Sequence, residues 1–182
     1  MPDILHQVKA LCLLYPAPKQ KLNIRNIGTS PQISYPCGFF DGAVADDLGG
    51  IGFVLHLSDS HFLVFSLGCG TSTNTRAELL ALWALLAMSK LLGIPLQTIF
   101  GDSQVIINWA NRISSLDSPS LRHWCEDIRS LIQNFSPLTL NHILREHNQQ
   151  TDCLSKNALE LDPSIGDFYE YMNDMITDHG NF

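Results

Sequence analysis

The chain has 182 residues, of which 45% are hydrophobic and 16% are charged, and its formal net charge at pH 7 is −7. This length suits one globular domain with a terminal extension, and the hydrophobic content is too high for an intrinsically disordered chain. No apolar run approaches the roughly 20 residues of a transmembrane helix, and the apolar stretch at residues 10–15 is too short for a signal peptide, so we expect an intracellular protein, nuclear or cytoplasmic, that is not secreted.

Residues 1–34 contain Pro16, Pro18 and Pro31 among polar and basic side chains, a composition typical of a linker. The first 40 residues carry four Lys or Arg against one Asp, whereas residues 41–182 carry seven Lys or Arg against 17 acidic residues. We therefore expect a basic, linker-like N-terminal segment before an acidic remainder. The five cysteines lie far apart and indicate neither a disulfide framework nor a zinc site.

A folded domain is expected over residues 35–160, and its first half contains three strand-like segments and one long helix. The strand-like segments form a simple meander and are residues 38–45, 50–57 and 61–67. Residues 75–92 lack Gly and Pro, are rich in Leu and Ala, and are apolar on nearly every side. This pattern predicts a helix buried at the centre of the fold.

The second half of the domain is predicted to alternate short strands with helices. In chain order these elements are a strand at 97–100, helices at 103–110 and 118–134, a strand at 138–144 and a helix at 149–159. The resulting order, βββαβααβα, predicts an α/β fold with a five-stranded mixed sheet flanked by helices. Residues 161–182 are interpreted as an acidic C-terminal tail.

Four carboxylates stand out by their positions. Asp41 lies in an otherwise apolar strand, while Glu78, Asp102 and Asp152 lie at strand ends or helix starts. Each has a structural explanation: Asp41 as a turn residue, Glu78 in a capping box with Thr75, Asp102 as a helix cap, and Asp152 in a first helical turn. Together they form a set of hard oxygen ligands sufficient for two Mg²⁺ ions, with Mn²⁺ as an alternative.

The sequence around these acids resembles the ribonuclease H family over residues 38–160. The matching motifs are Phe40-Asp41-Gly42, Thr73-Asn74-Thr75-Arg76-Ala77-Glu78-Leu79, Asp102-Ser103-Gln104 and Asn148-x-x-x-Asp152. The resemblance implies a ribonuclease H-like fold and hydrolysis of the RNA strand of RNA/DNA hybrids. It also leads us to expect a monomer, with a larger retrotransposon-derived polyprotein as one origin.

The resemblance further implies roles for single residues. Asp41 would bridge two metal ions, Asp152 would help to hold the ion that activates the attacking water, and Glu78 and Asp102 would complete the second metal site. Contacts with the nucleic acid, including the 2′-hydroxyl groups that distinguish RNA from DNA, are implied for Gly42, Thr73, Asn74, Gln104 and Asn148.

Two features depart from the best-known cellular members of this family. The segment Arg145-Glu146-His147-Asn148 leaves no room for the loop that carries their catalytic His, and in this it resembles archaeal-like enzymes and plant non-LTR retrotransposon domains. The basic insertion that many members use to grip the hybrid is missing between Trp109 and Pro119. Hybrid binding would then be weak or would depend on the basic N-terminal segment.

Two alternative functions remain open at this point. A DEDD-type 3′ exonuclease is suggested by the five-residue spacing from His147 to Asp152, but Ala43 stands where such enzymes need a second acid. A domesticated retrotransposon domain that binds nucleic acid or protein with little or no catalysis is suggested by the acidic net charge and the missing basic insertion.

Overall fold

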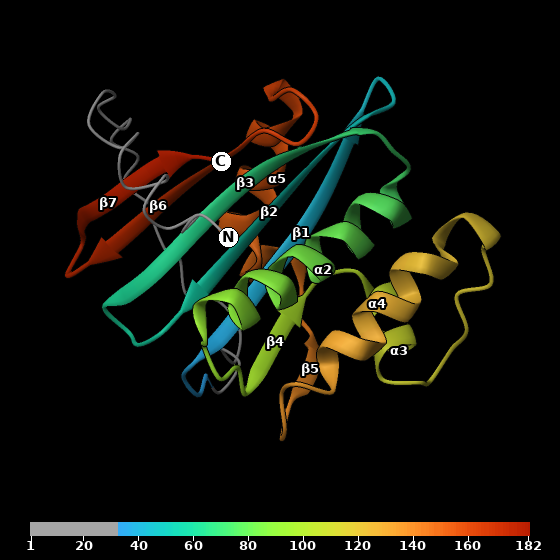
Figure 1. The fold of residues 1–182 in the computed structure, drawn as a ribbon, viewed down its shortest axis with the longest axis horizontal. Coiled ribbons are helices and arrows are strands. Elements are labelled where there is room, and N and C mark those ends of the chain that lie inside the picture. Colours follow the sequence, from blue (N-terminus) through green and yellow to red (C-terminus); the bar gives the residue numbers. More distant parts are fainter. Residues whose placement is uncertain (1–32) are drawn as a thin grey trace.

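The computed structural model describes residues 33–182, so most of the basic segment predicted at residues 1–34 lies outside the described part of the chain. One sheet runs through the fold, with the strand order β5-β4-β1-β2-β3-β6-β7. Figure 1 shows helices α2, α3 and α4 on the near face of this sheet and helix α5 behind it. The predicted α/β fold with a mixed sheet and flanking helices is confirmed.

The central strands follow the predicted meander. Strands β1 (Cys37–Ala45), β2 (Leu48–His56) and β3 (His61–Thr71) pair antiparallel. Strand β4 (Thr98–Gly101) pairs parallel to β1, and β5 (Thr139–His142) pairs parallel to β4. The helices are α2 (Asn74–Leu92), α3 (Gln104–Ala110), α4 (Arg122–Ile132) and α5 (Gln149–Asn157), with short 3-10 turns at Pro119–Leu121, Arg145–His147 and Ala158–Glu160.

The prediction of five strands is wrong, because the sheet formed by residues 33–182 has seven. Residues that we interpreted as a tail form strands β6 (Gly166–Met172) and β7 (Met175–Asn181), and β6 pairs antiparallel with β3. Asn173 and Asp174 connect the two strands with positive φ angles, the conformation that a tight two-residue hairpin requires. The hairpin covers the edge that β3 would otherwise expose.

Helix α2 lies at the centre of the fold and presses closely against β1. Its Leu79, Leu82 and Leu85 are fully buried. A side chain at Gly42 of β1 would lie 2.3 Å from the backbone of Ala77, so glycine permits this close approach. The first turn of α2 is thereby fixed beside the middle of β1.

Helix α5 approaches the opposite face of the sheet in a similar way. A side chain at Gly52 of β2 would lie 2.6 Å from Leu154 and from the backbone nitrogen of Ser155. The residues of α5 therefore stand directly over β1 and β2. Within residues 33–182, no helix has the length and hydropathy that would let it cross a membrane.

Candidate active site

Three carboxylates from three different elements meet at one point. Asp41 comes from the middle of β1, Glu78 from the first turns of α2, and Asp102 from the residue after β4. Asp102 reaches Asp41 because the preceding residue, Gly101, pairs with Phe40 in the parallel β1–β4 ladder. One potential ligand atom from each of the three acids lies within 4.8 Å of the other two.

Asp41 is a buried carboxylate with one hydrogen-bond donor. Asp41 is only 4% exposed, and the Ser155 hydroxyl donates to Asp41 Oδ2 at 2.6 Å. Burial raises the pKa of Asp41 to about 6; the Ser155 hydrogen bond opposes this rise, and the charges of Asp102 and Asp152 add to it. Ionised Asp41 is therefore held at a cost in the metal-free protein.

The pKa of Glu78 is raised further than that of Asp41. Burial, followed by the charges of Asp41 and Asp102, raises its pKa to about 9, although a backbone hydrogen bond from Gly42 opposes the rise. Its Oε2 atom is buried and has no hydrogen-bond partner among the described residues. A divalent cation would satisfy this oxygen and offset the repulsion, and three carboxylates suit Mg²⁺ or Mn²⁺.

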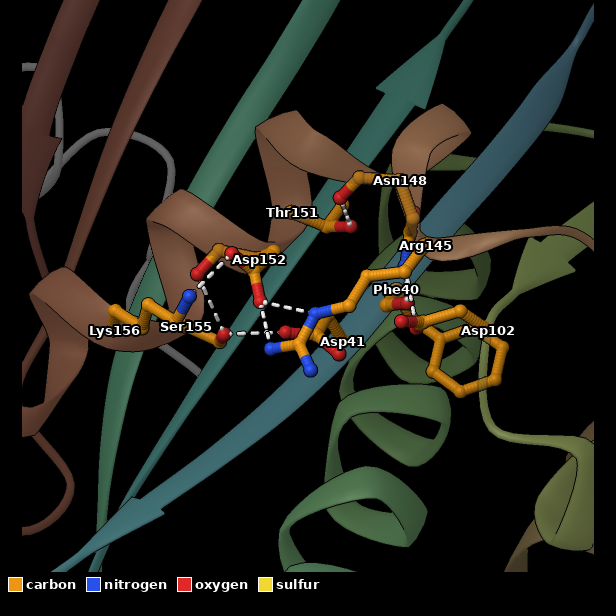
Figure 2. Close-up of polar contacts among 9 residues, drawn as sticks. All are labelled: Phe40, Asp41, Asp102, Arg145, Asn148, Thr151, Asp152, Ser155 and Lys156. Atoms are coloured by element: carbon orange, nitrogen blue, oxygen red, sulfur yellow. Dashed lines mark hydrogen bonds and ion pairs between the residues drawn. The ribbon is translucent and has the colours of Figure 1, made fainter.

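Asp152 lies beside this group rather than within it. Figure 2 shows its carboxylate between two cations: Arg145 Nε donates to Oδ1 at 3.1 Å, and Lys156 Nζ donates to Oδ2 at 2.6 Å. Burial raises the pKa of Asp152, but the hydrogen bonds from Lys156 and Arg145 outweigh this effect and leave the pKa below its usual value. Asp152 is thus kept ionised by its own partners.

The side chain of Ser155 connects Asp152 with the cluster of three acids. Besides donating to Asp41, its hydroxyl oxygen lies 3.0 Å from the backbone carbonyl oxygen of Asp152 (Figure 2). Ser155 is itself fully buried. Helix α5 therefore holds Asp152 at a defined position relative to Asp41, without bringing the two carboxylates into contact.

The structure places Asn148 inside the protein, at 2% exposure. Its Nδ2 atom donates to the Phe40 carbonyl oxygen and to Asp102 Oδ1, both at 2.9 Å (Figure 2). It joins the start of α5 to β1 and to the end of β4, and it orients Asp102. A contact between Asn148 and nucleic acid stays a prediction.

The remaining predicted contact residues lie on the surface near the three acids. Thr73 and Asn74 are exposed at the start of α2, and Gln104 is exposed at the start of α3, where its Nε2 donates to Asn108 Oδ1 at 2.7 Å. Thr73, not Thr75, is the N-cap of α2 and accepts a hydrogen bond from the Arg76 backbone. The predicted capping box of Thr75 with Glu78 is therefore wrong.

Three site residues went unassigned in the sequence: Arg145, Ser155 and Lys156. Lys156 follows Asp152 by four residues on a helix, a spacing that predicts an ion pair. Ser155 and Arg145 gave no comparable signal, because their contacts depend on how α5 and the turn before it dock on the sheet. The His147 side chain lies beside its neighbour, with Nε2 3.7 Å from Glu146 Oε1.

The chain is similar to several known proteins. A family model described as reverse transcriptase-like matches residues 39–158. The chain is 30% identical over 129 residues to the uncharacterized protein YpeP of Bacillus subtilis, covering 66% of this chain and 57% of that protein. It is 29% identical over 125 residues to ribonuclease HI of Halobacterium salinarum, covering 67% of this chain and 63% of the enzyme. The chain thus spans less than two thirds of the length of either relative.

Solved structures show the same fold. RNase H1 from Halobacterium salinarum superposes with a TM-score of 0.64 at 28% identity, covering 68% of this chain and 96% of that one. LC11-RNase H1, solved in complex with an RNA/DNA hybrid, superposes with a TM-score of 0.62 at 24% identity over 68% of this chain and 96% of that one.

Proposed function

The chain belongs to the reverse transcriptase-like family and has a ribonuclease H fold, and from this premise we propose that it is a metal-dependent endonuclease that hydrolyses the RNA strand of RNA/DNA hybrids. The observation that carries the proposal is the convergence of Asp41, Glu78 and Asp102 within 4.8 Å. The likeness to a halobacterial ribonuclease HI supports the choice of substrate.

The proposed cofactors are two divalent ions, Mg²⁺ or Mn²⁺. Asp41, Glu78 and Asp102 would hold them, with Asp152 completing the set. Divalent cations in such a site supply an activated water and offset negative charge at the scissile phosphate and the departing oxygen. Two features support a cation site: Glu78 Oε2 is buried without a hydrogen-bond partner among the described residues, and the pKa values of Asp41 and Glu78 are raised. Both are expected of carboxylates that bind a cation.

The contribution of the protein is positioning. Ser155 fixes the orientation of Asp41, and Asn148 fixes that of Asp102. Arg145 and Lys156 keep Asp152 ionised down to a lower pH than an isolated Asp. With the acids held rigidly in this way, little reorganisation is needed during the reaction.

We assign substrate contacts to the exposed residues that border the acids. Thr73, Asn74 and Gln104 offer hydroxyl and amide groups that suit phosphate oxygens and 2′-hydroxyls, and the backbone at Gly42 lies next to Glu78. Monomeric action, an intracellular location and an origin in a larger polyprotein stay predictions.

The test incubates the purified chain with an RNA/DNA hybrid labelled on the RNA strand, and in parallel with duplex DNA, duplex RNA and single strands, in Mg²⁺ or Mn²⁺. We expect internal cleavage of the hybrid RNA alone. Asp102→Asn keeps an acceptor for Asn148 and should lower the rate by at least about 100-fold, which corresponds to the loss of about 3 kcal/mol of transition-state stabilisation. Asp117→Asn, in an exposed loop, is the matched control.

The second candidate is a binding module without catalysis, favoured by the net charge of −7 and the missing basic insertion. Hybrid binding without cleavage in either metal would support it and contradict the proposed activity. Trimming of substrates only from their 3′ ends would instead support an exonuclease.

A further inference from the structure

Away from the acids, five rings stand side by side across the face of the sheet that α5 packs on. These residues, here called the aromatic row, are Phe100, Phe39, His56, Phe62 and Tyr171, from β4, β1, β2, β3 and β6 in turn. Successive ring centroids lie 4.8, 5.6, 5.1 and 4.9 Å apart, and the first and last pairs are stacked. The strand registers place all five side chains on one face.

Helix α5 does not account for this row. It packs at Gly50 and Gly52, near the other end of β2 from His56. Phe40, Phe53 and Phe65 point to the opposite face and form the core under α2. Helix α5 therefore does not pack on the row, and all members of the row except Phe100 are partly exposed.

Two ring nitrogens near the row also need partners. His56 Nδ1 and His179 Nε2 are buried without a hydrogen bond from any described residue. His179 stacks on Tyr169, on the same face of the sheet, at 5.9 Å. Buried polar atoms are rarely left without a partner, so a polar group of a segment bound on this face would satisfy these two nitrogens.

The negative charge beside the row favours a basic binding segment. Two exposed acidic residues lie in the turns beside the row, Asp59 between β2 and β3 and Asp174 between β6 and β7, and strands β1, β2, β3, β6 and β7 contain neither Lys nor Arg. Asp59 accepts a hydrogen bond from Tyr35 beside the row, and the Asn173 backbone joins the Asp174 turn to Ser60 of the β2–β3 turn. Such a surface disfavours a phosphate backbone and favours a basic segment.

We propose that residues 1–32 of the same chain bind across the aromatic row. They carry four Lys or Arg against one Asp, and Pro16, Pro18 and Pro31. Proline-rich segments dock on aromatic surfaces, and the basic side chains of this segment are complementary to the acidic Asp59 and Asp174 beside the row.

The connection also suits this occupant. Tyr35, only three residues after the segment ends, already lies against the row, with its ring 6.2 Å from that of His56. The 12 residues from Lys21 to Ile33 can span up to about 40 Å when extended, and five strands are about 19 Å across. Basic residues engaged on this face are not free to bind a hybrid at the acids, although the inference does not depend on the proposed function.

The test uses the full chain and a zero-length carbodiimide cross-linker, which joins Lys to carboxylates in direct contact. We expect Lys19 or Lys21 to be linked to Asp59 or Asp174, and the yield to fall several-fold between 50 and 500 mM salt because screening weakens exposed ion pairs. Linkage instead to Glu126 or Asp127 on α4, or no linkage, would overturn the inference.

Two further measurements make the result decisive. The double variant Phe62→Ala/Tyr171→Ala should lower the cross-link yield at least about fivefold, while the exposed α2 variant Leu91→Ala should leave it unchanged. If the double variant does not fold, the salt dependence of the natural chain still decides. A mixture of isotope-labelled and unlabelled protein should give only unmixed cross-links, because mixed ones would mean that a second copy occupies the row.

Discussion

The replacement Asp41→Asn should stabilise the metal-free protein, and the gain should depend on pH. Raising a carboxyl pKa from about 4 to about 6 makes the ionised form about 3 kcal/mol less stable in the folded state than in the unfolded state. The folded pKa lies above the unfolded one, so the natural chain loses this stability as the pH rises from about 4 to about 6. An Asn has no charge to bury, and its oxygen can still accept from Ser155.

The expected gain for Asp41→Asn is therefore about 0.5 kcal/mol at pH 4 and about 3 kcal/mol at pH 8, equivalent at the higher pH to a rise in Tm of about 6–12 °C. Thermal unfolding followed by circular dichroism in a chelator measures it. Asp46→Asn is the control, because Asp46 is exposed in the β1–β2 turn with a φ of 49°, which Asn tolerates. A gain of equal size at both pH values, or a loss of stability at pH 8, would refute the reasoning.

Three more predictions concern the same site. Arg145→Ala should raise the pKa of Asp152 and lower kcat by about 10-fold or more, most strongly at the acidic end of the pH profile. Arg145→Lys should restore part of the lost kcat. If kcat of Arg145→Ala and of the natural chain depended on pH in the same way, the result would argue against a role for this ion pair. Asn148→Ala should lower the free energy of unfolding in urea by about 1–3 kcal/mol, because it removes hydrogen bonds from the buried Phe40 carbonyl oxygen and from the half-buried Asp102 carboxylate, whereas Asn157→Ala on the exposed side of α5 should change little. Mg²⁺ binding should release protons and tighten between pH 6 and 9, since Asp41 and Glu78 must ionise to bind; calorimetry in buffers of different ionisation enthalpy measures this, and no proton release would contradict it.

The cluster of three acids was predictable because its signals are local. A carboxylate in an apolar strand, or directly after one, can be recognised without knowing what packs against it, and the order of the motifs followed the order of the elements. The contacts that support the acids were not predictable in this way. Arg145 meets Asp152 only because the 3-10 turn and α5 fold back on each other.

The β6–β7 hairpin was missed for a related reason. Its residues do not alternate cleanly between apolar and polar, because both faces carry aromatic side chains: Phe168 joins the core under α2, while Tyr169 points to the opposite face. Glu170 looked like part of an acidic tail, yet it contacts His61 at 2.7 Å across the sheet. A partner 109 positions away leaves no trace in the local pattern.

The hairpin changes where the folding unit stops. The family match ends at residue 158, yet the sheet continues to Asn181, and the Phe182 and Gly166 backbones exchange hydrogen bonds beyond it. A fragment cut at the end of the match would uncover the edge of β3 at the seven residues that pair with β6, His61–Leu67, and unpaired apolar strand edges drive association between molecules. Fragments made for expression or fusion should therefore include β6 and β7, because without them the exposed edge of β3 would promote aggregation.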